Sequence, residues 1–499
     1  MTSFIGIDLG TTYSAVATID DTGRPIIVHN DSGDNITPSC VVEEFPGVML
    51  VGEFARRQWG SAPETAASRF KRDMGTSITH SINNEEFTPT QLSTFILKKL
   101  LKDSKSSLGG IGEAVVTIPA NFAHEARDAT MAAAKAAGLN VKYIINEPTA
   151  AALYYAFKNG EDLSGIYAVY DLGGGTFDVS IIRVDGQDVE VMATNGVHKL
   201  GGDDFDAALQ KLVQTKFKEI TGEDLEEDDF TKNDAEEEKK SLSKRKQVTI
   251  RVAKQMVDIK RDEFEEIIST FVTQAEMLCE ATIGDAGIDV NDVKGVFVAG
   301  GSTRIPLVTE SITKIFKQEP ISSVNVDEVV ALGAALYAAF KGDQSKLSTV
   351  QQNAIKKIQV SESTGKCFGT ISMSHNDSRE EFEKVNSIII KKGHKIPCSI
   401  TQSFYTAYEG QEAINCTVTE STAAETDPRF VNIIHEGSLD LPPNRPENQE
   451  IQITFSYDDN QVMKCSFVDV GTGKEEKVDL TMSVSSDSST SETDKFVVE

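Results

Sequence analysis

The sequence predicts an α/β domain followed by an antiparallel β-sandwich, and three observations carry this prediction. An Asp-Leu-Gly turn between two apolar runs occurs twice, at residues 5–16 and 168–182. Short β runs alternate with helical periodicities up to residue 341, and short period-2 strands follow beyond residue 357. With 499 residues the chain exceeds what one hydrophobic core normally serves. We therefore expect separate α/β and all-β domains.

The first part of the chain contains repeated β-then-α patterns. Strands are predicted at 114–118 and 296–299, and each is followed by a helical pattern, at 121–137 and 305–316 respectively. Pro148 stands where a helix over 149–157 begins, a position at which its missing N–H costs nothing. A further helix over 329–340 is rich in small residues that suit close packing. These βα units predict a domain over residues 1–341.

The remaining chain divides into a linker, a sandwich and a tail. Residues 342–357 are polar without an apolar period and are predicted as the inter-domain linker. A sandwich is predicted over 358–485 from strands at 387–390, 399–406, 413–418, 450–456 and 462–468. Residues 486–499 begin with a Ser/Thr/Asp-rich stretch, and we expect an acidic, disordered tail there.

Composition excludes several classes of protein. The formal net charge of −28 argues against nucleic acid or an anionic membrane as a partner. No apolar run of 18 residues and no basic N-terminal region are present, so neither a membrane span nor a secretory signal is expected. The six cysteines lack C-x-x-C spacing and are predicted to be reduced thiols of a cytoplasmic protein. The acidic clusters at 223–229 and 236–238 are expected to be mostly solvated.

The two Asp-Leu-Gly turns have the residue types of a phosphate site. Glycines at the end of a buried strand let backbone N–H groups approach phosphate, and the adjacent threonines add hydroxyls. Asp8 and Asp171 stand at equivalent strand ends, where carboxylates hold hydrated Mg²⁺ through water. A tight hairpin with a capping aspartate is the alternative, which two copies make less favourable. The loops comprise Gly10, Thr11 and Thr12 in one copy and Gly173, Gly174, Gly175 and Thr176 in the other.

A third glycine pair supports a nucleotide as the ligand. Gly300 and Gly301 precede Ser302 at a predicted strand-to-helix junction, where backbone amides suit an anion or the ribose side of a nucleotide. The planar guanidinium of Arg304 could stack on a base. This motif alone is weak evidence for a nucleotide site, and the other two glycine-rich loops support it.

Five motifs in order resemble the nucleotide-binding domain of the seventy-kilodalton heat-shock chaperone family, the DnaK type. They are I-D-L-G-T-T-Y-S (7–14), I-N-E-P-T-A-A-A (145–152), Y-D-L-G-G-G-T-F-D-V-S (170–180), L-G-G-D-D-F-D (200–206) and G-G-S-T-R-I-P (300–306). The resemblance implies an actin-like, ribonuclease-H-like ATPase domain of two lobes, with ATP or ADP in the cleft between them. A small-molecule kinase of the same fold is a weaker alternative, because a sandwich domain would then have no role.

The resemblance also implies roles for individual residues. Lys71 matches the lysine that activates or positions the attacking water, and Glu147 matches the carboxylate that orders this water and the magnesium shell. Asp8 and Asp171 match the pair around Mg²⁺ and K⁺, and Asp178 matches a further K⁺ carboxylate. The γ-phosphate hydroxyls match Thr11, Thr12 and Thr176. The remaining cofactor-binding positions are Tyr13, Gly201, Gly202, Glu236, Lys239, Lys240, Ser243, Arg304 and Asp327.

The C-terminal half resembles the same family more loosely. Segments 436–455 and 470–478 are similar to its β-sandwich, which implies binding of extended, apolar peptide segments of unfolded proteins. Ile414 aligns with a pocket-lining position, although an ordinary core role is as good an interpretation.

The chain also departs from the family pattern. The leucine-rich linker is replaced by a segment offering only Val350, Ile355 and Ile358. We expect no helical lid. The favoured hypothesis is a compact ATP-dependent chaperone helped by a J-domain protein and a nucleotide-exchange factor. The alternative is an adaptor with little or no activity that partners another chaperone or the ribosome.

Overall fold

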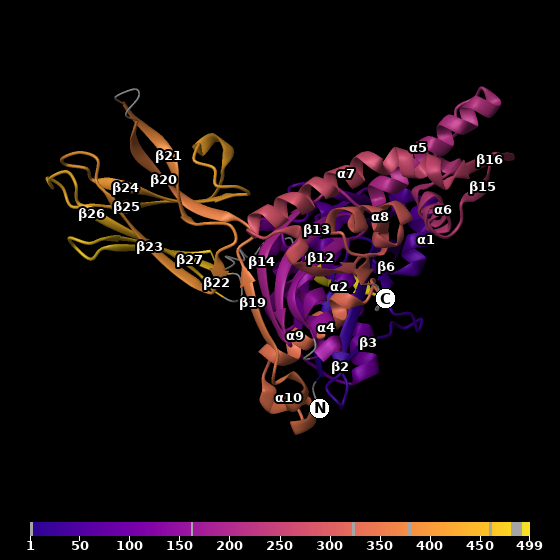
Figure 1. The fold of residues 1–499 in the computed structure, drawn as a ribbon, viewed down its shortest axis with the longest axis horizontal. Helices are drawn as coiled ribbons and strands as arrows, with labels where there is room; N and C mark the ends of the chain where they lie inside the picture. Colours follow the sequence, from indigo (N-terminus) through magenta and orange to yellow (C-terminus); the bar gives the residue numbers. More distant parts are fainter. Residues whose placement is uncertain (1–2, 161–162, 322–324, 377–380, 459–461, 481–491) are drawn as a thin grey trace. The chain divides into compact units, whose positions relative to one another are not determined.

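The computed structural model describes residues 3–160, 163–321, 325–376, 381–458, 462–480 and 492–499 (Figure 1). Its contacts divide the chain into two compact units. The first contains Met1–Val360 together with Ser486–Glu499, and the second contains Ser361–Ser485. Among the described residues, no helix is both long and apolar enough to cross a membrane. All six cysteines are free thiols.

The first unit contains two mixed sheets with the same topology. One has the order β11-β10-β1-β2-β3, and the other runs β18-β17-β12-β13-β14. In each sheet, the three strands that come first in the chain (β1, β2 and β3, or β12, β13 and β14) pair antiparallel. The two later strands (β10 and β11, or β17 and β18) add in parallel at the free edge of β1 or β12. Their bounds are β1 (Ser3–Asp8), β2 (Tyr13–Ile19), β3 (Pro25–Val28), β10 (Ile111–Ile118), β11 (Val141–Asn146), β12 (Ser164–Leu172), β13 (Phe177–Asp185), β14 (Asp188–Val197), β17 (Val293–Ala299) and β18 (Pro320–Ile321). The sequence repeat is thus a structural repeat.

Two helices, α4 (Glu147–Asn159) and α9 (Val329–Lys341), follow the last strand of each sheet and lie side by side (Figure 1). Their backbones approach closely, because a Cβ at Gly333 would lie only 1.7 Å from the carbonyl oxygen of Ala150. The small residues predicted for this segment therefore serve helix packing. Both helices bury their apolar side chains in one core with β12, β13 and β14.

The other elements of the first unit surround these sheets. They include β4 (Thr37–Pro38), β5 (Cys40–Phe45), β6 (Val48–Val51), α1 (Glu53–Ser61), β7 (Ala66–Ser68), η2 (Phe70–Asp73), β8 (His80–Ile82), β9 (Glu85–Phe87), α2 (Pro89–Leu108), α3 (His124–Ala136), α5 (Gly202–Thr221), α6 (Lys232–Lys244), β15 (Gln247–Val252), β16 (Gln255–Lys260), α7 (Arg261–Asp285), η6 (Gly301–Arg304) and α8 (Pro306–Phe316).

The predicted linker, residues 342–357, is structured and belongs to the first unit. It forms η7 (Gln344–Lys346) and α10 (Thr349–Ile355), which the polar composition did not indicate. Ile355 and Ile358 are each 1% exposed and join the core of α4 and α9, whereas Val350 is exposed. Ile355 within the segment and Ile358 directly after it thus anchor the predicted linker.

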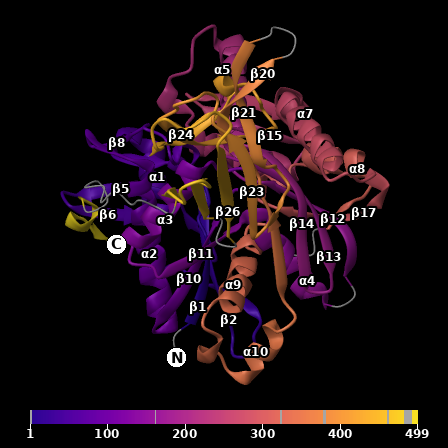
Figure 2. The same cartoon turned by 90° about the vertical axis from the view of Figure 1, so that its left-hand side faces the viewer.

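The end of the chain also differs from the prediction. Disorder was expected over 486–499; residues 486–491 lie outside the described residues, but η9 (Glu492–Lys495) and β29 (Val497–Val498) are ordered (Figure 2). β29 pairs in parallel with β6. The physical reason is the apolar run Phe496-Val497-Val498, whose phenylalanine is buried.

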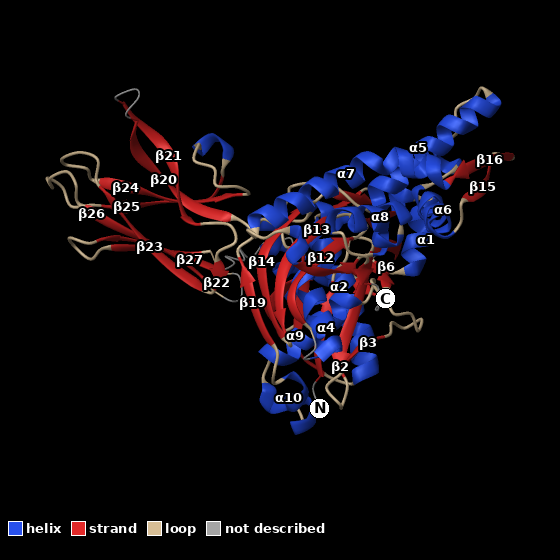
Figure 3. Ribbon diagram, viewed as in Figure 1, coloured by secondary structure: helices blue, strands red, loops and turns tan. Residues whose placement is uncertain are grey.

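The second unit contains two four-stranded antiparallel sheets, with the orders β21-β20-β24-β25 and β23-β26-β27-β28 (Figure 3). Phe455 and Phe467 are fully buried in a core that both sheets share. The five predicted strands are present, which confirms the sandwich. The strands are β20 (Cys367–Asn376), β21 (Glu381–Ile390), β23 (Cys398–Tyr405), β24 (Ala413–Ser421), β25 (Asn432–Asp440), β26 (Glu450–Tyr457), β27 (Met463–Asp469) and β28 (Glu475–Asp479), with β19 (Gln359–Ser363) and β22 (Lys395–Ile396) as short additions.

Candidate nucleotide site

Two adjoining cavities in the first unit gather most of the predicted site residues. The smaller, of about 100 Å³, is lined by Asp8, Gly10, Thr11, Thr12, Tyr13, Lys71, Glu147, Asp171, Gly173, Gly174, Thr176, Gly300, Gly301 and Asp327. The larger, of about 530 Å³, is lined by Thr12, Tyr13, Gly174, Gly202, Glu236, Lys239, Lys240, Ser243, Gly301, Ser302, Arg304 and Asp327. Because five of these residues line both, the cavities form one continuous site. Gly175, Gly201 and Asp178 lie just outside the lining.

The two glycine-rich loops meet at the centre of the site. A Cβ at Gly174 would lie 1.9 Å from Thr12 Oγ1, so only glycine permits this approach. The carbonyl of Gly174 accepts a hydrogen bond from the Asp203 amide at 2.7 Å, at the start of α5. Ser302 donates its hydroxyl proton to the Gly173 carbonyl at 2.9 Å. Loops from three separate parts of the chain are therefore fixed to one another.

Lys71 and Glu147 form a buried ion pair in the smaller cavity. Lys71 comes from η2 and Glu147 begins α4, and Lys71 Nζ lies 2.5 Å from Glu147 Oε1. Both side chains are less than 10% exposed. The pairing joins residues 76 positions apart in the chain.

Three aspartates beside this pair have raised pKa values. Burial, with the nearby Glu147 carboxylate, raises the pKa of Asp8 to about 7, although Lys71 and a 3.1 Å hydrogen bond from Thr117 act against this. Burial and Glu147 also raise the pKa values of Asp171 and Asp178 well above the ordinary range. The carboxylates outnumber the nearby cation, so this part of the site favours additional positive charge.

Paired charges fix the helix α6 beside the larger cavity. Glu236 lies 2.9 Å from Lys240 Nζ and 3.0 Å from Arg56 of α1. Burial alone would raise the pKa of Glu236, but Lys240 and then Arg56 outweigh it and hold the pKa at about 2. Tyr13 donates its hydroxyl proton to the same carboxylate at 3.3 Å. The expectation that the acidic cluster is solvated thus fails for Glu236, which is buried.

Arg304 lies on the other side of the larger cavity. Its guanidinium is 2.7 Å from Asp327 and donates to Asn325 at 2.9 Å. About half of the Arg304 side chain is exposed, so its planar face remains accessible. The two predicted residues are therefore held together by direct contact.

A family model described as Hsp70 protein matches residues 4–83 and 76–499 of the chain. The chain belongs to the Hsp70 family. Members of this family are generally ATPases that bind nucleotide with Mg²⁺ and act as chaperones on unfolded peptides.

Two observations fit the Hsp70 cofactors to these residues. Thr12 Oγ1 and Asp178 Oδ1 are buried and have no hydrogen-bond partner among the described residues. The Thr12 hydroxyl can donate to a phosphate oxygen, and the carboxylate oxygen of Asp178 suits a cation. No group of three or more His, Cys, Asp or Glu in the described part of the chain could ligate a metal directly.

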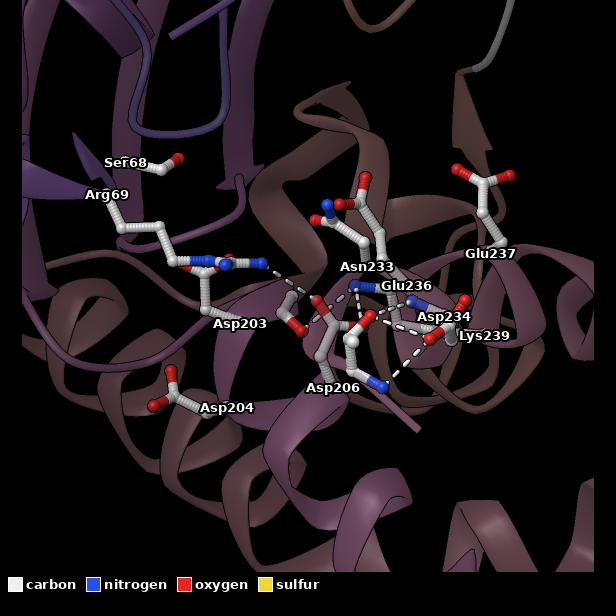
Figure 4. Close-up of polar contacts among 12 residues, drawn as sticks. Ser68, Arg69, Asp203, Asp204, Asp206, Asn233, Asp234, Glu236, Glu237 and Lys239 are labelled. Carbon is white, nitrogen blue, oxygen red and sulfur yellow. Dashed lines mark hydrogen bonds and ion pairs between the residues drawn. The ribbon is translucent and has the colours of Figure 1, made fainter. Parts of the chain in front are cut away.

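One buried network in this Hsp70-family chain was not predicted from sequence (Figure 4). Arg69, immediately before η2, lies 2.5 Å from Asp203 and 3.6 Å from Asp206, both near the start of α5. Asp206 in turn lies 2.7 Å from Lys239 Nζ. The network connects the segment carrying Lys71 to the helix of the larger cavity. Asp203 and Asp206 lie within the motif at 200–206 and Lys239 is a predicted site residue, but no spacing in the sequence indicates that they meet Arg69.

Proposed function

We propose that the protein binds Mg²⁺·ATP across both cavities and hydrolyses it as a compact chaperone. The observation that carries this proposal is the convergence of twenty-one predicted residues on one continuous site, with Lys71 and Glu147 in contact. The triphosphate would lie in the smaller cavity, between Thr11 and Thr12 on one side and Thr176 on the other. The nucleoside would occupy the larger one.

The reacting end needs little covalent chemistry from the protein, since phosphoryl transfer to water depends on positioning and electrostatic stabilisation. Lys71 would position the attacking water, and Glu147 would accept a hydrogen bond from it. Asp8 and Asp171 would hold Mg²⁺ through water, and Asp178 would contribute to a K⁺ site. The metal, when bound, neutralises charge on the phosphate oxygens.

The base-binding end relies on fixed, pre-organised groups. Glu236, Lys239, Lys240 and Ser243 present polar atoms from one face of α6, and these would contact the ribose and adenine. Arg304 would cover one face of the adenine by stacking its guanidinium. Because the ion pairs of Glu236 exist without a ligand, little ordering is needed when nucleotide binds.

Single-turnover hydrolysis of ATP by the full chain tests this function. Lys71→Ala should lower the rate constant at least ~100-fold, within the range for loss of a positioned catalytic group, while nucleotide is still bound. Lys105→Ala is the matched control, because this exposed lysine lies at the end of α2. An unchanged rate constant of ATP hydrolysis in Lys71→Ala would contradict this mechanism.

The second unit is proposed to bind extended apolar peptides without a helical lid. Its support is the antiparallel sandwich, whose edge strands offer backbone groups to an added strand. Ile414 is partly buried against the core, which leaves both of its interpretations open. Peptide affinity in ATP and in ADP is the measurement; a difference supports nucleotide-controlled client binding. Normal hydrolysis without any stimulation by peptide would favour the adaptor instead.

A further inference from the structure

The end of the chain adds a strand to the sheet that precedes Lys71. The sheet has the order β29-β6-β5-β7, and β7 leads directly into Arg69 and η2. The Val497 amide donates to the Gly47 carbonyl at 2.8 Å, and the Glu499 amide donates to the Met49 carbonyl at 2.9 Å. Without β29, β6 would present an unpaired edge, which folded proteins generally cover.

An aromatic cluster anchors this strand. The Phe496 ring lies 5.7 Å from that of Phe87 in β9 and 5.5 Å from that of Phe95 in α2, both edge-to-face. Phe496 is 8% exposed and Thr493 is 1% exposed, although the neighbouring residues of the segment are open to solvent. Two buried side chains in an otherwise exposed segment are typical of a peptide seated in a groove.

Basic residues of α2 contact the polar atoms of the same segment. Lys98 Nζ lies 3.0 Å from the Asp494 carboxylate and 3.1 Å from the Thr493 carbonyl. Lys102 donates to the Val498 carbonyl at 3.2 Å. In the other direction, Lys495 lies 2.8 Å from Glu85 of β9. Most of these contacts are exposed, so they contribute orientation and register more than affinity.

We propose that the edge of β6, together with the facing side of α2, is a peptide-binding groove on the ATPase unit, occupied in cis by residues 492–499. The groove selects an extended segment in which an acidic and a basic residue precede an aromatic residue and two β-branched ones. It binds by strand addition, with Phe496 as the anchor. When the groove is occupied, β6 is held in place. Because β6 pairs with β5 and β5 pairs with β7, the occupied groove also supports the segment after β7, which bears Lys71.

Amide hydrogen exchange on the full chain tests the groove without reference to ATP hydrolysis. In the unaltered protein, the amides of Val51, Val497 and Glu499, whose hydrogen bonds belong to this ladder, should be protected. Phe496→Ala should speed their exchange about 100-fold, as expected when a buried phenylalanine is truncated. Val497→Ala is the matched control, since the Val497 side chain is 57% exposed; it should change exchange less than about threefold.

A trans experiment establishes the groove as a binding site. A variant lacking residues 492–499 should bind a synthetic peptide of residues 488–499 and regain protection at Val51, whereas the same peptide with Phe496 replaced by Ala should not restore it. Equal exchange in Phe496→Ala and Val497→Ala would overturn the proposal. The proposal would also be overturned if light scattering showed a concentration-dependent dimer that is lost when residues 492–499 are deleted. In that case the segment would occupy the groove of a second copy of the chain.

Discussion

Replacing Arg69 is the sharpest test of how the site is held together. Arg69→Met keeps the length of the side chain but removes the guanidinium from between Asp203 and Asp206. Both aspartates are at least nine-tenths buried. Once Arg69 is replaced, Lys239 would be the remaining cation paired with Asp206. The variant should therefore destabilise the first unit far more than loss of an ordinary surface charge.

The magnitude follows from the geometry. At the observed 2.5 Å between Arg69 Nε and Asp203 Oδ1, an effective dielectric constant near 20 gives an attraction of about 7 kcal/mol. The cost of taking both charges out of water offsets part of this, and removal of one partner from a buried pair typically costs about 3–5 kcal/mol. We expect a loss of that size. Arg57→Met, which breaks an exposed pair with Glu53, should cost only a few tenths of a kcal/mol.

The chain supplies its own probe for this experiment. Trp59 is the single tryptophan, and the Arg69 guanidinium lies 4.5 Å from its ring centroid. Urea unfolding followed by Trp59 fluorescence therefore reports on this segment and not on the sandwich. The loss should be smaller at pH 5 than at pH 8, because burial raises the pKa of Asp206 to about 6 even against Lys239. Equal losses for Arg69→Met and Arg57→Met would refute the reasoning.

Two further predictions concern charges at the nucleotide site. In EDTA and without nucleotide, Asp8 with its pKa of about 7 keeps a proton that the unfolded chain releases near pH 4, so stability should fall as pH rises between these values. Asp8→Asn should flatten this dependence in urea unfolding and gain about 4 kcal/mol at pH 8. A gain no larger than that of the exposed Asp21→Asn would contradict the prediction. Glu236→Gln should weaken ATP binding about 10–100-fold in calorimetry, as loss of a buried charged hydrogen-bond partner does. Glu237→Gln is the control, because the carboxylate of this neighbouring residue is exposed. Equal effects of the two substitutions would count against a role for Glu236.

The strands and loops of the site could be predicted because each has a local signal. A buried apolar run ending in Asp-Leu-Gly fixes both the strand and the turn, and its repetition implied the second copy at Asp171. The network of Arg69 could not be found in this way. Its partners follow 134 and 137 positions later, and nothing in either segment encodes the contact. Only the fold, by placing the end of β7 beside the start of α5, brings them together.

The two segments that differ from prediction share one cause. Residues 342–357 and 486–499 are polar on average, and an average conceals a few apolar anchors. Ile355 in the first segment and Ile358 directly after it are buried, and Phe496 is buried in the second. Because a short segment is ordered when a buried side chain offsets its loss of conformational entropy, one phenylalanine in a complementary pocket outweighs a polar composition.

The charges of the site carry a cost to the fold that a bound cation would offset. Asp8, Glu147, Asp171 and Asp178 place four carboxyl groups around one ammonium, that of Lys71. Burial first, and then the excess of carboxylates, disfavours the ionised forms and raises the pKa values of the three aspartates. A structural cluster would be improved by replacing these aspartates with apolar residues or amides. A site that receives cations together with a nucleotide requires the excess, because the ligand supplies the missing positive charge. The same imbalance that lowers stability is therefore the property that suits these residues to phosphoryl transfer.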